Sequence, residues 1–495
     1  MNEWRKDLGN FLAEEQVLNK FQINRFFPLI EGQAQAVVQP TDRSEISSIV
    51  KIASKHKLAL VPVSSSYDFH GSTLSSQQSI IIDMSQLNGT ISINKSFDGM
   101  SVDIEPGLTF RKLNKSLEED GFRVITPIRM PADTSVLSTY YGRYPLLEAN
   151  RHGYEQDWML LTYMFTNTDG EMVATGSDGL ETGTPQGDCP FSPRMDVGRL
   201  ILGGMGAFGI VSQASCKMKY RLNEYEFLFC ESDNLQKLVQ DTRKMTLSTE
   251  AAQSVLLLDN KMLAGLAASS IETYDKLTNN LPKWNAIFAL GGESDLIEVE
   301  RKDLEEAAAD HNLSLSRDAP TTGLEVMLKE EFTKPTSAIN HFEYDPHVRV
   351  EYYSTAGRLS SVRGAVTEYL QSVGVNEDEQ IGFLMNSIEL GRTYFCEYDI
   401  FYGERNIQPD NLPMIGEVDL LQLYRGMYQT VMDNGGIINV PRNSIVSELV
   451  YKRTELQPYY QSLRRLKGVM DPQNILHPSM LFNGEGGIPS NIGGA

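Results

Sequence analysis

In roughly the first quarter of the chain, short apolar runs alternate with segments whose apolar residues have helical spacing. Apolar residues recur every three or four positions after Ser44, the expected N-cap, and again over 110–120. Residues 3–20 have the spacing of an amphipathic helix. Strands are expected at 36–38, 58–63, 80–84, 91–93 and 101–104. This pattern predicts two small α+β units in succession.

Residues 232–440 have a different and more regular pattern. Helices are expected at 234–247, 274–281, 294–311 and 362–373. Strands are expected at 255–258, 284–290, 348–353, 383–390 and 393–402. We interpret this part as a separate α+β domain, an antiparallel sheet covered by helices. Residues 126–195 are rich in Pro, Gly, Tyr and Asp, so mostly loops are expected there.

Length and charge narrow the classes of function. A chain of 495 residues is too long for one ordinary hydrophobic core, so two or three domains are expected. A formal net charge of −21 disfavours binding to nucleic acids or to anionic membranes. No apolar run approaches the roughly 20 residues that span a bilayer. The charged N-terminus lacks the apolar core of a signal peptide, so a cytoplasmic protein is expected.

The four cysteines are widely separated, without a CxxC pair: Cys189, Cys216, Cys230 and Cys396. This spacing is typical of reduced, buried thiols, and it encodes neither an iron–sulfur cluster nor a cysteine-built metal site. We predict no metal site.

The stretch 60–71, LVPVSSSYDFHG, joins an apolar strand to a turn that closes at Gly71. Small residues in such a turn let successive backbone N–H groups point into one concavity, which can hold a diphosphate without lysines. The alternative interpretation is an ordinary serine-rich turn.

Further motifs follow in a fixed order along the chain: VDIEPGLTFRKL (102–113), DGEMVATG (169–176), GGMGAFGIVS (203–212) and DPQNILHP (471–478). Together with the serine loop, they resemble the vanillyl-alcohol oxidase/p-cresol methylhydroxylase (PCMH-type FAD-binding) flavoprotein superfamily over nearly the whole chain. The resemblance implies an FAD-binding domain at 1–222, a substrate or cap domain at 223–440, and a C-terminal segment at 441–495 that returns to the first domain.

The resemblance also implies which residues contact FAD. The expected cofactor-binding residues are Ser64, Ser65, Ser66, Asp68, His70, Gly71, Ser135, Val136, Gly206, Gly209, Ile210, Val211 and His477. Three serines replace the usual glycines of the loop, and each serine would cost on the order of 1 kcal/mol if a positive φ were required there.

Other positions depart from the family pattern. The residue that links FAD covalently in some members falls near Val350, and valine cannot form that bond, so dissociable FAD is expected. The two tyrosines and one arginine that hold a phenolate correspond to Phe69, Pro441 and Arg442, of which only the arginine is kept. The HxGDGNxH metal segment of the 2-hydroxy-acid dehydrogenases is missing from the sequence.

Three residues are the catalytic candidates. Arg442 supplies positive charge and a planar fork that suits a carboxylate or a phenolate. Arg392 lies on a strand whose family counterpart faces the flavin, and Tyr141 is expected to line a pocket. A surface salt bridge, a solvated strand face and simple packing are the respective alternatives.

The sequence thus indicates an FAD-dependent oxidase or dehydrogenase that removes a hydride from a hydroxylated or benzylic carbon of a small, aromatic or anionic substrate. A 2-hydroxy-acid or polyol dehydrogenase and a non-catalytic subunit with a degenerate FAD site are the alternatives. The electron acceptor, either O₂ or a carrier protein, stays open. A homodimer is expected from the resemblance.

Overall fold

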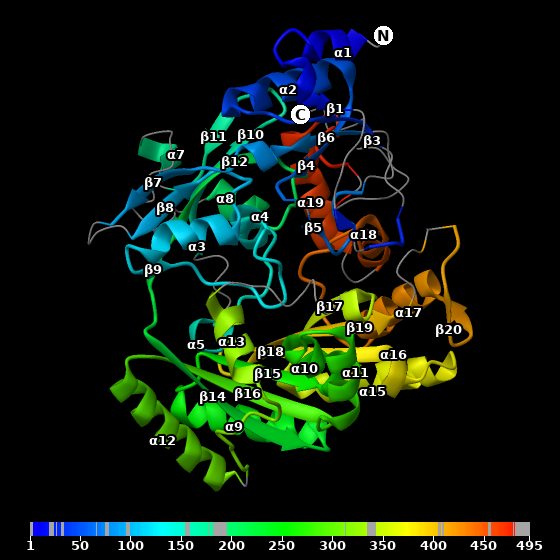
Figure 1. The fold of residues 1–495 in the computed structure, drawn as a ribbon. Helices are drawn as coiled ribbons and strands as arrows, with labels where there is room; N and C mark the ends of the chain where they lie inside the picture. Colours follow the sequence, from blue (N-terminus) through cyan, green and yellow to red (C-terminus); the bar gives the residue numbers. More distant parts are fainter. Residues whose placement is uncertain are drawn as a thin grey trace.

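The computed structural model describes residues 3–18, 24–25, 27–30, 34–65, 67–74, 79–95, 100–153, 159–176, 178–181, 196–311, 313–333, 343–403, 407, 410–453, 457–478 and 480. Figure 1 shows two lobes: the blue, cyan and red elements form one, and the green and yellow elements form the other. The predicted α+β fold is confirmed.

The first sheet has the order β1–β3–β6–β4 and contains Val17–Leu18, Ala34–Val38, Ser79–Asp83 and Ala59–Val63. β3, β6 and β4 are parallel, because helix α2 (Arg43–His56) crosses between β3 and β4. Asp42 caps α2 by accepting a hydrogen bond from the Ser44 amide at 2.8 Å, so the N-cap is Asp42 and not Ser44.

The second sheet has the order β11–β10–β12–β8–β7 and contains Met172–Ala174, Leu160–Thr166, Ile210–Lys217, Ser101–Ile104 and Thr90–Asn94. Helix α3 (Phe110–Glu118) buries Phe110, Leu113 and Leu117 beside it. The short elements of this lobe are β2 (Asn24–Arg25), β5 (Tyr67–Asp68), β9 (Phe122–Arg123), β13 (Lys219–Tyr220), α4 (Val136–Tyr141), α7 (Asp178–Glu181) and α8 (Val197–Ile201). Helix α5 (Ala149–His152) instead packs against β15 and β18 of the other lobe (Figure 1).

The other lobe is built on a six-stranded antiparallel sheet of order β14–β16–β15–β18–β19–β17. Its strands are Glu224–Ser232, Trp284–Gly292, Ser254–Asp259, Ile381–Ile388, Thr393–Phe401 and His347–Thr355. The helices around it are α9 (Leu235–Thr249), α10 (Asn260–Ala267), α11 (Ile271–Asn280), α12 (Ser294–Asp310), α13 (Leu324–Thr333), α15 (Ala356–Ser372), α16 (Glu377–Gln380) and α17 (Leu420–Asp433). A small hairpin, β20 (Met414–Ile415) and β21 (Val418–Asp419), precedes α17.

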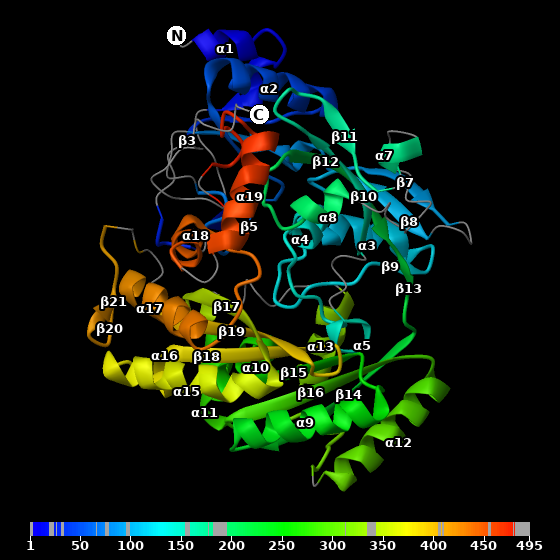
Figure 2. The same cartoon turned by 180° about the vertical axis from the view of Figure 1, so that it is seen from behind.

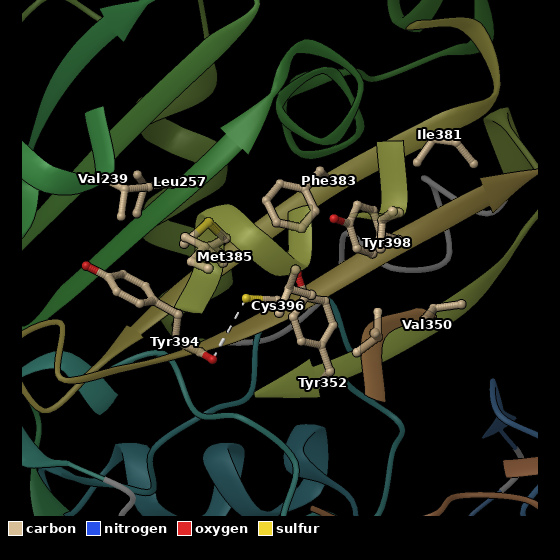
Figure 3. Packing of buried hydrophobic residues seen from close by; sticks show 14 of the residues in the cluster. Val239, Leu257, Val350, Tyr352, Ile381, Phe383, Met385, Tyr394, Cys396 and Tyr398 are labelled. Carbon is tan, nitrogen blue, oxygen red and sulfur yellow. Dashed lines mark hydrogen bonds between the residues drawn. The ribbon is translucent and has the colours of Figure 1, made fainter. Parts of the chain in front are cut away.

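One face of this sheet is apolar. Val350, Tyr352, Phe383, Met385 and Cys396 pack into the core beneath α9, α12, α15 and α17 (Figure 3). The opposite face is also apolar over β14, β16, β15 and β18, which pack under α10 and α13. At its β19–β17 edge it carries His347, Arg349 and Glu351 on β17 and Glu397 and Asp399 on β19, all nine-tenths buried or more. Their side chains meet residues of the first lobe.

The C-terminal segment lies with the first lobe. Helices α18 (Ser444–Tyr451) and α19 (Gln457–Met470), orange and red, stand among the elements of the first lobe in Figure 2. After α19, the Leu60 amide donates to Ile475 O at 2.7 Å and the His477 amide donates to Leu60 O at 2.8 Å. Asp471, fully buried, fixes this turn by accepting from the Ile475 and Leu476 amides.

Some local predictions were wrong. The helix expected over 3–20 is only α1, Glu3–Leu8, because the chain turns at Gly9 and Asn10 and then forms β1. Strand β14 and helices α4, α10, α13, α17 and α18 were not predicted. Cys189 lies outside the described residues, and the other three cysteines are buried free thiols. Every helix in the described part of the chain is too short or too polar to cross a bilayer.

Candidate functional site

A cavity lies in the first lobe. Three segments enclose it: the loop that follows β4, helix α4, and the glycine-rich loop that precedes β12. The predicted residues that line it are Ser64, Ser65, Asp68, Tyr141, Gly206, Gly209, Val211 and His477.

Asp68 shapes the loop after β4. Its buried carboxylate accepts hydrogen bonds from the amides of His70, Ser72 and Thr73 at 3.0–3.2 Å. These bonds satisfy the carboxylate within the loop, so the side chains of Ser64 and Ser65 are left to face the cavity. Ser66 lies outside the described residues.

The opposite wall is the loop 203–209, whose glycines expose their backbone to the cavity. Gly206 has φ +87°, and a Cβ there would meet Pro62 Cγ at 2.3 Å. Because Pro62 and Gly206 both line the cavity, an alanine at 206 would push one wall inward. The glycine predicted from the family motif therefore has a structural reason here.

His477 closes the cavity from the C-terminal segment. Its Nδ1 lies 2.6 Å from Met205 O, and burial lowers the pKa of its imidazole to about 4. Lys467 supports the same corner: its buried ammonium donates to Asp471 and to the carbonyl oxygens of Ala207 and Leu476. The distant chain end and the glycine-rich loop are thus held together.

A charged cluster lies where the cavity wall meets the cap sheet. Arg442 Nε donates to Glu351 Oε2 at 2.7 Å and its Nη1 donates to Gly142 O at 2.9 Å. The guanidinium lies 3.7 Å above the ring of Tyr144, which lines the cavity. Glu351 Oε1 is 3.3 Å from His70 Nε2.

Burial decides the protonation of this cluster. It lowers the pKa of His70 to about 4, against the pull of Glu351, so His70 is neutral at pH 7. Burial opposes ionisation of Glu351 as well, but the charge and the hydrogen bond of Arg442 hold the pKa of that carboxyl below its ordinary value. Burial also raises the pKa of Tyr144 to about 12, so its phenol stays protonated.

The cluster continues along the sheet face. Arg129 contacts Glu397 and donates to Asp399 Oδ2 at 2.7 Å, and His347 Nε2 is 3.3 Å from the same Asp399 oxygen. Arg349 lies 4.8 Å above the ring of Phe69, which lines the cavity, and its Nε is 3.8 Å from Glu397. Burial raises the pKa of Glu397 to about 7.

The structure places several predicted residues behind the cavity wall. Ser135 caps α4, accepting from the Ser138 amide at 3.0 Å, and neighbours Thr134, Leu137 and Ser138 line the cavity instead. Val136 and Ile210 belong to apolar clusters. Gly71 faces Phe27, and His70 belongs to the charged cluster.

Two positions differ from the expectation. Arg392 does not face the cavity: its side chain is 76% exposed and pairs with Glu389 in the turn after β18. Val350 points into the apolar layer of the cap sheet, since its strand neighbours Arg349 and Glu351 take the opposite face (Figure 3). The residues of β17 that face the first lobe are therefore at odd positions.

Sequence reasoning missed Glu351, Arg349 and Arg129. One signal was present: His347, Arg349 and Glu351 repeat at every second position of a strand that is otherwise apolar. Charges at a period of two on a buried strand indicate one polar face, and a polar buried face indicates a site. Arg129 gave no such signal, because its loop position reveals nothing about its partners.

The residues present suit FAD. Serine hydroxyls and turn amides at 64–65 can donate to a diphosphate, and the rest of the lining is largely apolar or aromatic: Val63, Met84, Met130, Leu137, Tyr141 and Val211. Tyr141 is fixed by donating to Ile201 O at 3.0 Å, and burial raises the pKa of its phenol.

Comparison with known sequences agrees with this fit. The FAD binding domain family matches residues 34–176. The glycolate oxidase subunit GlcD of Bacillus subtilis is 22% identical over 473 residues, which cover 92% of this chain and 90% of the relative. The mitochondrial D-lactate dehydrogenase [cytochrome] of Arabidopsis thaliana is 23% identical over 241 residues, 49% of this chain and 37% of the relative.

Solved structures share the fold over almost the full length. p-Cresol methylhydroxylase with substrate bound superposes with a TM-score of 0.80 at 15% identity, covering 97% of this chain and 96% of the other. 4-Ethylphenol oxidase from Gulosibacter chungangensis, in complex with isoeugenol, gives a TM-score of 0.78 at 15% identity, with 97% of both chains covered.

Proposed function

Because this chain belongs to the PCMH-type FAD-binding flavoproteins, we propose that its cavity holds FAD non-covalently and that the charged cluster beside it holds a small substrate. The protein is an FAD-dependent oxidoreductase. The single observation that carries the proposal is the contact between the cavity lining and the charged cluster. Tyr144 and Phe69 line the cavity on one side and stack on Arg442 and Arg349 of the cluster on the other.

FAD, when bound, accepts a hydride from a hydroxylated or benzylic carbon. The chain's own residues must then orient that carbon, exclude water and receive the hydroxyl proton. Phe69, Met130 and Tyr144 form an apolar group that excludes water from this end of the cavity. His70 is neutral and lies behind the cavity wall with its Nε2 3.3 Å from Glu351 Oε1, so its proposed role is to position Glu351.

Arg442 and Arg349 have different proposed roles. The N–H groups of Arg442 already serve Glu351, Gly142 O and Arg143 O, so it fixes the position of Glu351 and contributes charge. Arg349 is buried, and its Nε and Nη2 make no hydrogen bond within the described structure. A buried guanidinium with unused donors suits an anionic oxygen of a substrate.

The substrate class has two candidates. Likeness to the glycolate oxidase subunit over 92% of the chain, together with the unused donors of Arg349, favours a 2-hydroxy acid. Likeness in fold to the two phenol-acting enzymes favours a 4-alkylphenol or an aromatic alcohol. The cytoplasmic location and the homodimer expected from the sequence belong to the proposal as well.

The test is a screen for bleaching of the bound flavin without oxygen, with glycolate, D- and L-lactate, 4-alkylphenols and aromatic alcohols in parallel. We expect a yellow protein that releases its colour on acid precipitation and is bleached by one of these classes. Colour that stays in the pellet would refute dissociable FAD. A colourless protein that does not take up added FAD would refute the enzyme and favour the non-catalytic subunit.

The variant Arg349→Met tests whether the substrate is bound as an anion. Loss of a charge-assisted hydrogen bond, which contributes about 1.5–3 kcal/mol, should weaken binding of an anionic substrate at least tenfold. The bleaching rate at saturation and the flavin spectrum should change little. Arg317→Met, an exposed arginine that pairs with Glu226, is the matched control.

A further inference from the structure

A second hollow lies in the cap lobe, at one end of the six-stranded sheet. It is lined where β15 passes into α10, by the first residues of β16 and β18, and by residues of α15 and α16. We call it the cap pocket. None of the described residues that line it also lines the cofactor cavity, and the proposed oxidation uses none of them.

One wall of the cap pocket is aromatic. Trp284 and Phe383 are buried, and their rings meet edge to face with 6.2 Å between centroids. The side chains of Ile381 and Phe383 lie toward the same end of the sheet in Figure 3. Rigid apolar walls of this kind suit the apolar body of a small organic molecule.

Most of the charge in the lining is neutralised in pairs. Arg363 pairs with Glu377, and its guanidinium lies 4.7 Å from the ring centroid of Phe383. Lys283 Nζ lies 2.8 Å from Asp378 Oδ1, and both of these side chains are more than half exposed. These four charges therefore need no charged ligand.

Asp259, the remaining acid of the described lining, is also satisfied. Its buried carboxylate accepts hydrogen bonds from the amides of Met262 and Phe383, both at 2.9 Å. Two backbone donors thus hold this carboxylate against the end of the sheet, without a cation in contact with it in the described structure.

Lys261 is the exception in the lining. It is only 5% exposed, and its Nζ makes a single hydrogen bond within the described part of the chain, to Ile381 O at 3.2 Å. Asp259 and Asp345 feel its charge, but neither forms an ion pair with it. An ammonium has three N–H donors, so two donors of a buried cation are unused. Leaving them unused is costly, and an anion in the pocket would remove that cost.

We propose that the cap pocket binds a small organic monocarboxylate with an aromatic body. The carboxylate accepts hydrogen bonds from Lys261 Nζ, and the body packs against Trp284 and Phe383. A monoanion matches the single unused cation, whereas a dianion such as phosphate would also be repelled by Asp259. The site does not depend on the proposed function, because it shares no described lining residue with the cofactor cavity.

Benzoate and benzamide provide a matched pair of probes, because they have the same ring and differ in the charge of the polar end. Benzoate also suits Arg349 in the proposed substrate site, so binding is measured by titration calorimetry with the full-length Arg349→Met protein. The variant Lys261→Met is added to this background. Lys276→Met, which removes an exposed lysine of α11 outside the lining, is the matched control.

We expect benzoate to bind the Arg349→Met protein more tightly than benzamide does. Lys261→Met should weaken binding of benzoate by about tenfold and change binding of benzamide by less than about twofold. Lys276→Met should leave both affinities unchanged. A second measurement keeps Lys261 intact: benzoate should change the tryptophan fluorescence, and Trp284→Phe should remove this change because Trp284 forms the wall.

Three results would overturn the proposal. The first is that benzoate does not bind the Arg349→Met protein. The second is that benzoate and benzamide bind equally, which would make the pocket merely apolar. The third is that the fluorescence change survives in Trp284→Phe, which would place the bound benzoate elsewhere. Bleaching of the flavin is measured separately, so failure of this proposal and failure of the proposed function are distinguished.

Discussion

The two faces of the six-stranded cap sheet are made by the same strands and do different work. On one face Leu257, Met385 and Tyr352 pack under helices and define the lobe (Figure 3). On the other face, at the edge formed by β17 and β19, Glu351, Glu397 and Asp399 pair with arginines of the first lobe. The apolar face can be satisfied within its own lobe, whereas the charged face is satisfied only when both lobes are present. This difference makes the charged face suitable for a site between lobes.

Removal of Arg129 should have the largest effect on the charged face. Arg129→Met leaves Glu397 and Asp399 buried without their cation, which should lower the free energy of unfolding by about 3–5 kcal/mol at pH 8. Urea denaturation measures this loss. The loss should shrink near pH 5.5, where Glu397 takes up a proton; an equal loss at both pH values would contradict the assignment.

The loss of stability caused by a substitution on the apolar face should not depend on pH. Leu257 is 1% exposed and pairs with Met385 across β15 and β18, so Leu257→Ala should cost about 2–5 kcal/mol by leaving a cavity. The same denaturation series at pH 8 and pH 5.5 checks this. Affinity for FAD, measured by flavin fluorescence, should be unchanged, and a large loss of affinity would show that the two faces are not independent.

His347 should make a smaller contribution to stability, and the direction of its pH dependence is defined. Burial lowers its pKa from 6.5 to about 4, so the unfolded chain binds a proton at a higher pH than the folded one. Stability contributed by the neutral imidazole is present above pH 6.5 and is lost as the pH falls toward 4. The free energy of unfolding of the wild type relative to His347→Gln should fall by about 2 kcal/mol between pH 7.5 and pH 5. A rise over this range would contradict the neutral histidine.

Arg392 should give the smallest effect. Its side chain is 76% exposed, so Arg392→Gln should change stability by less than about 0.5 kcal/mol and leave the rate of flavin bleaching unchanged. A loss of bleaching would restore the catalytic role that the sequence pattern suggested for this residue.

Much of the fold followed from local patterns. Five of the six strands of the cap sheet and the helices α9, α11, α12 and α15 follow from alternation and helical spacing, and the FAD motifs follow from their order along the chain. The cofactor side of the site was also predicted in part: Ser64, Ser65, Gly206, Gly209 and His477 line one cavity. Motifs predict these residues because backbone shape, which they encode locally, forms that wall.

The sequence by itself determined that β17 has one apolar and one charged face, because side chains alternate along any strand. Only the tertiary structure decided what the charged face meets. Arg442 and Glu351 are 91 residues apart, and Arg129 and Glu397 are 268 apart. The free energy of burying such charges depends on partners that no local pattern specifies, so their pairing appears only when the lobes are folded together.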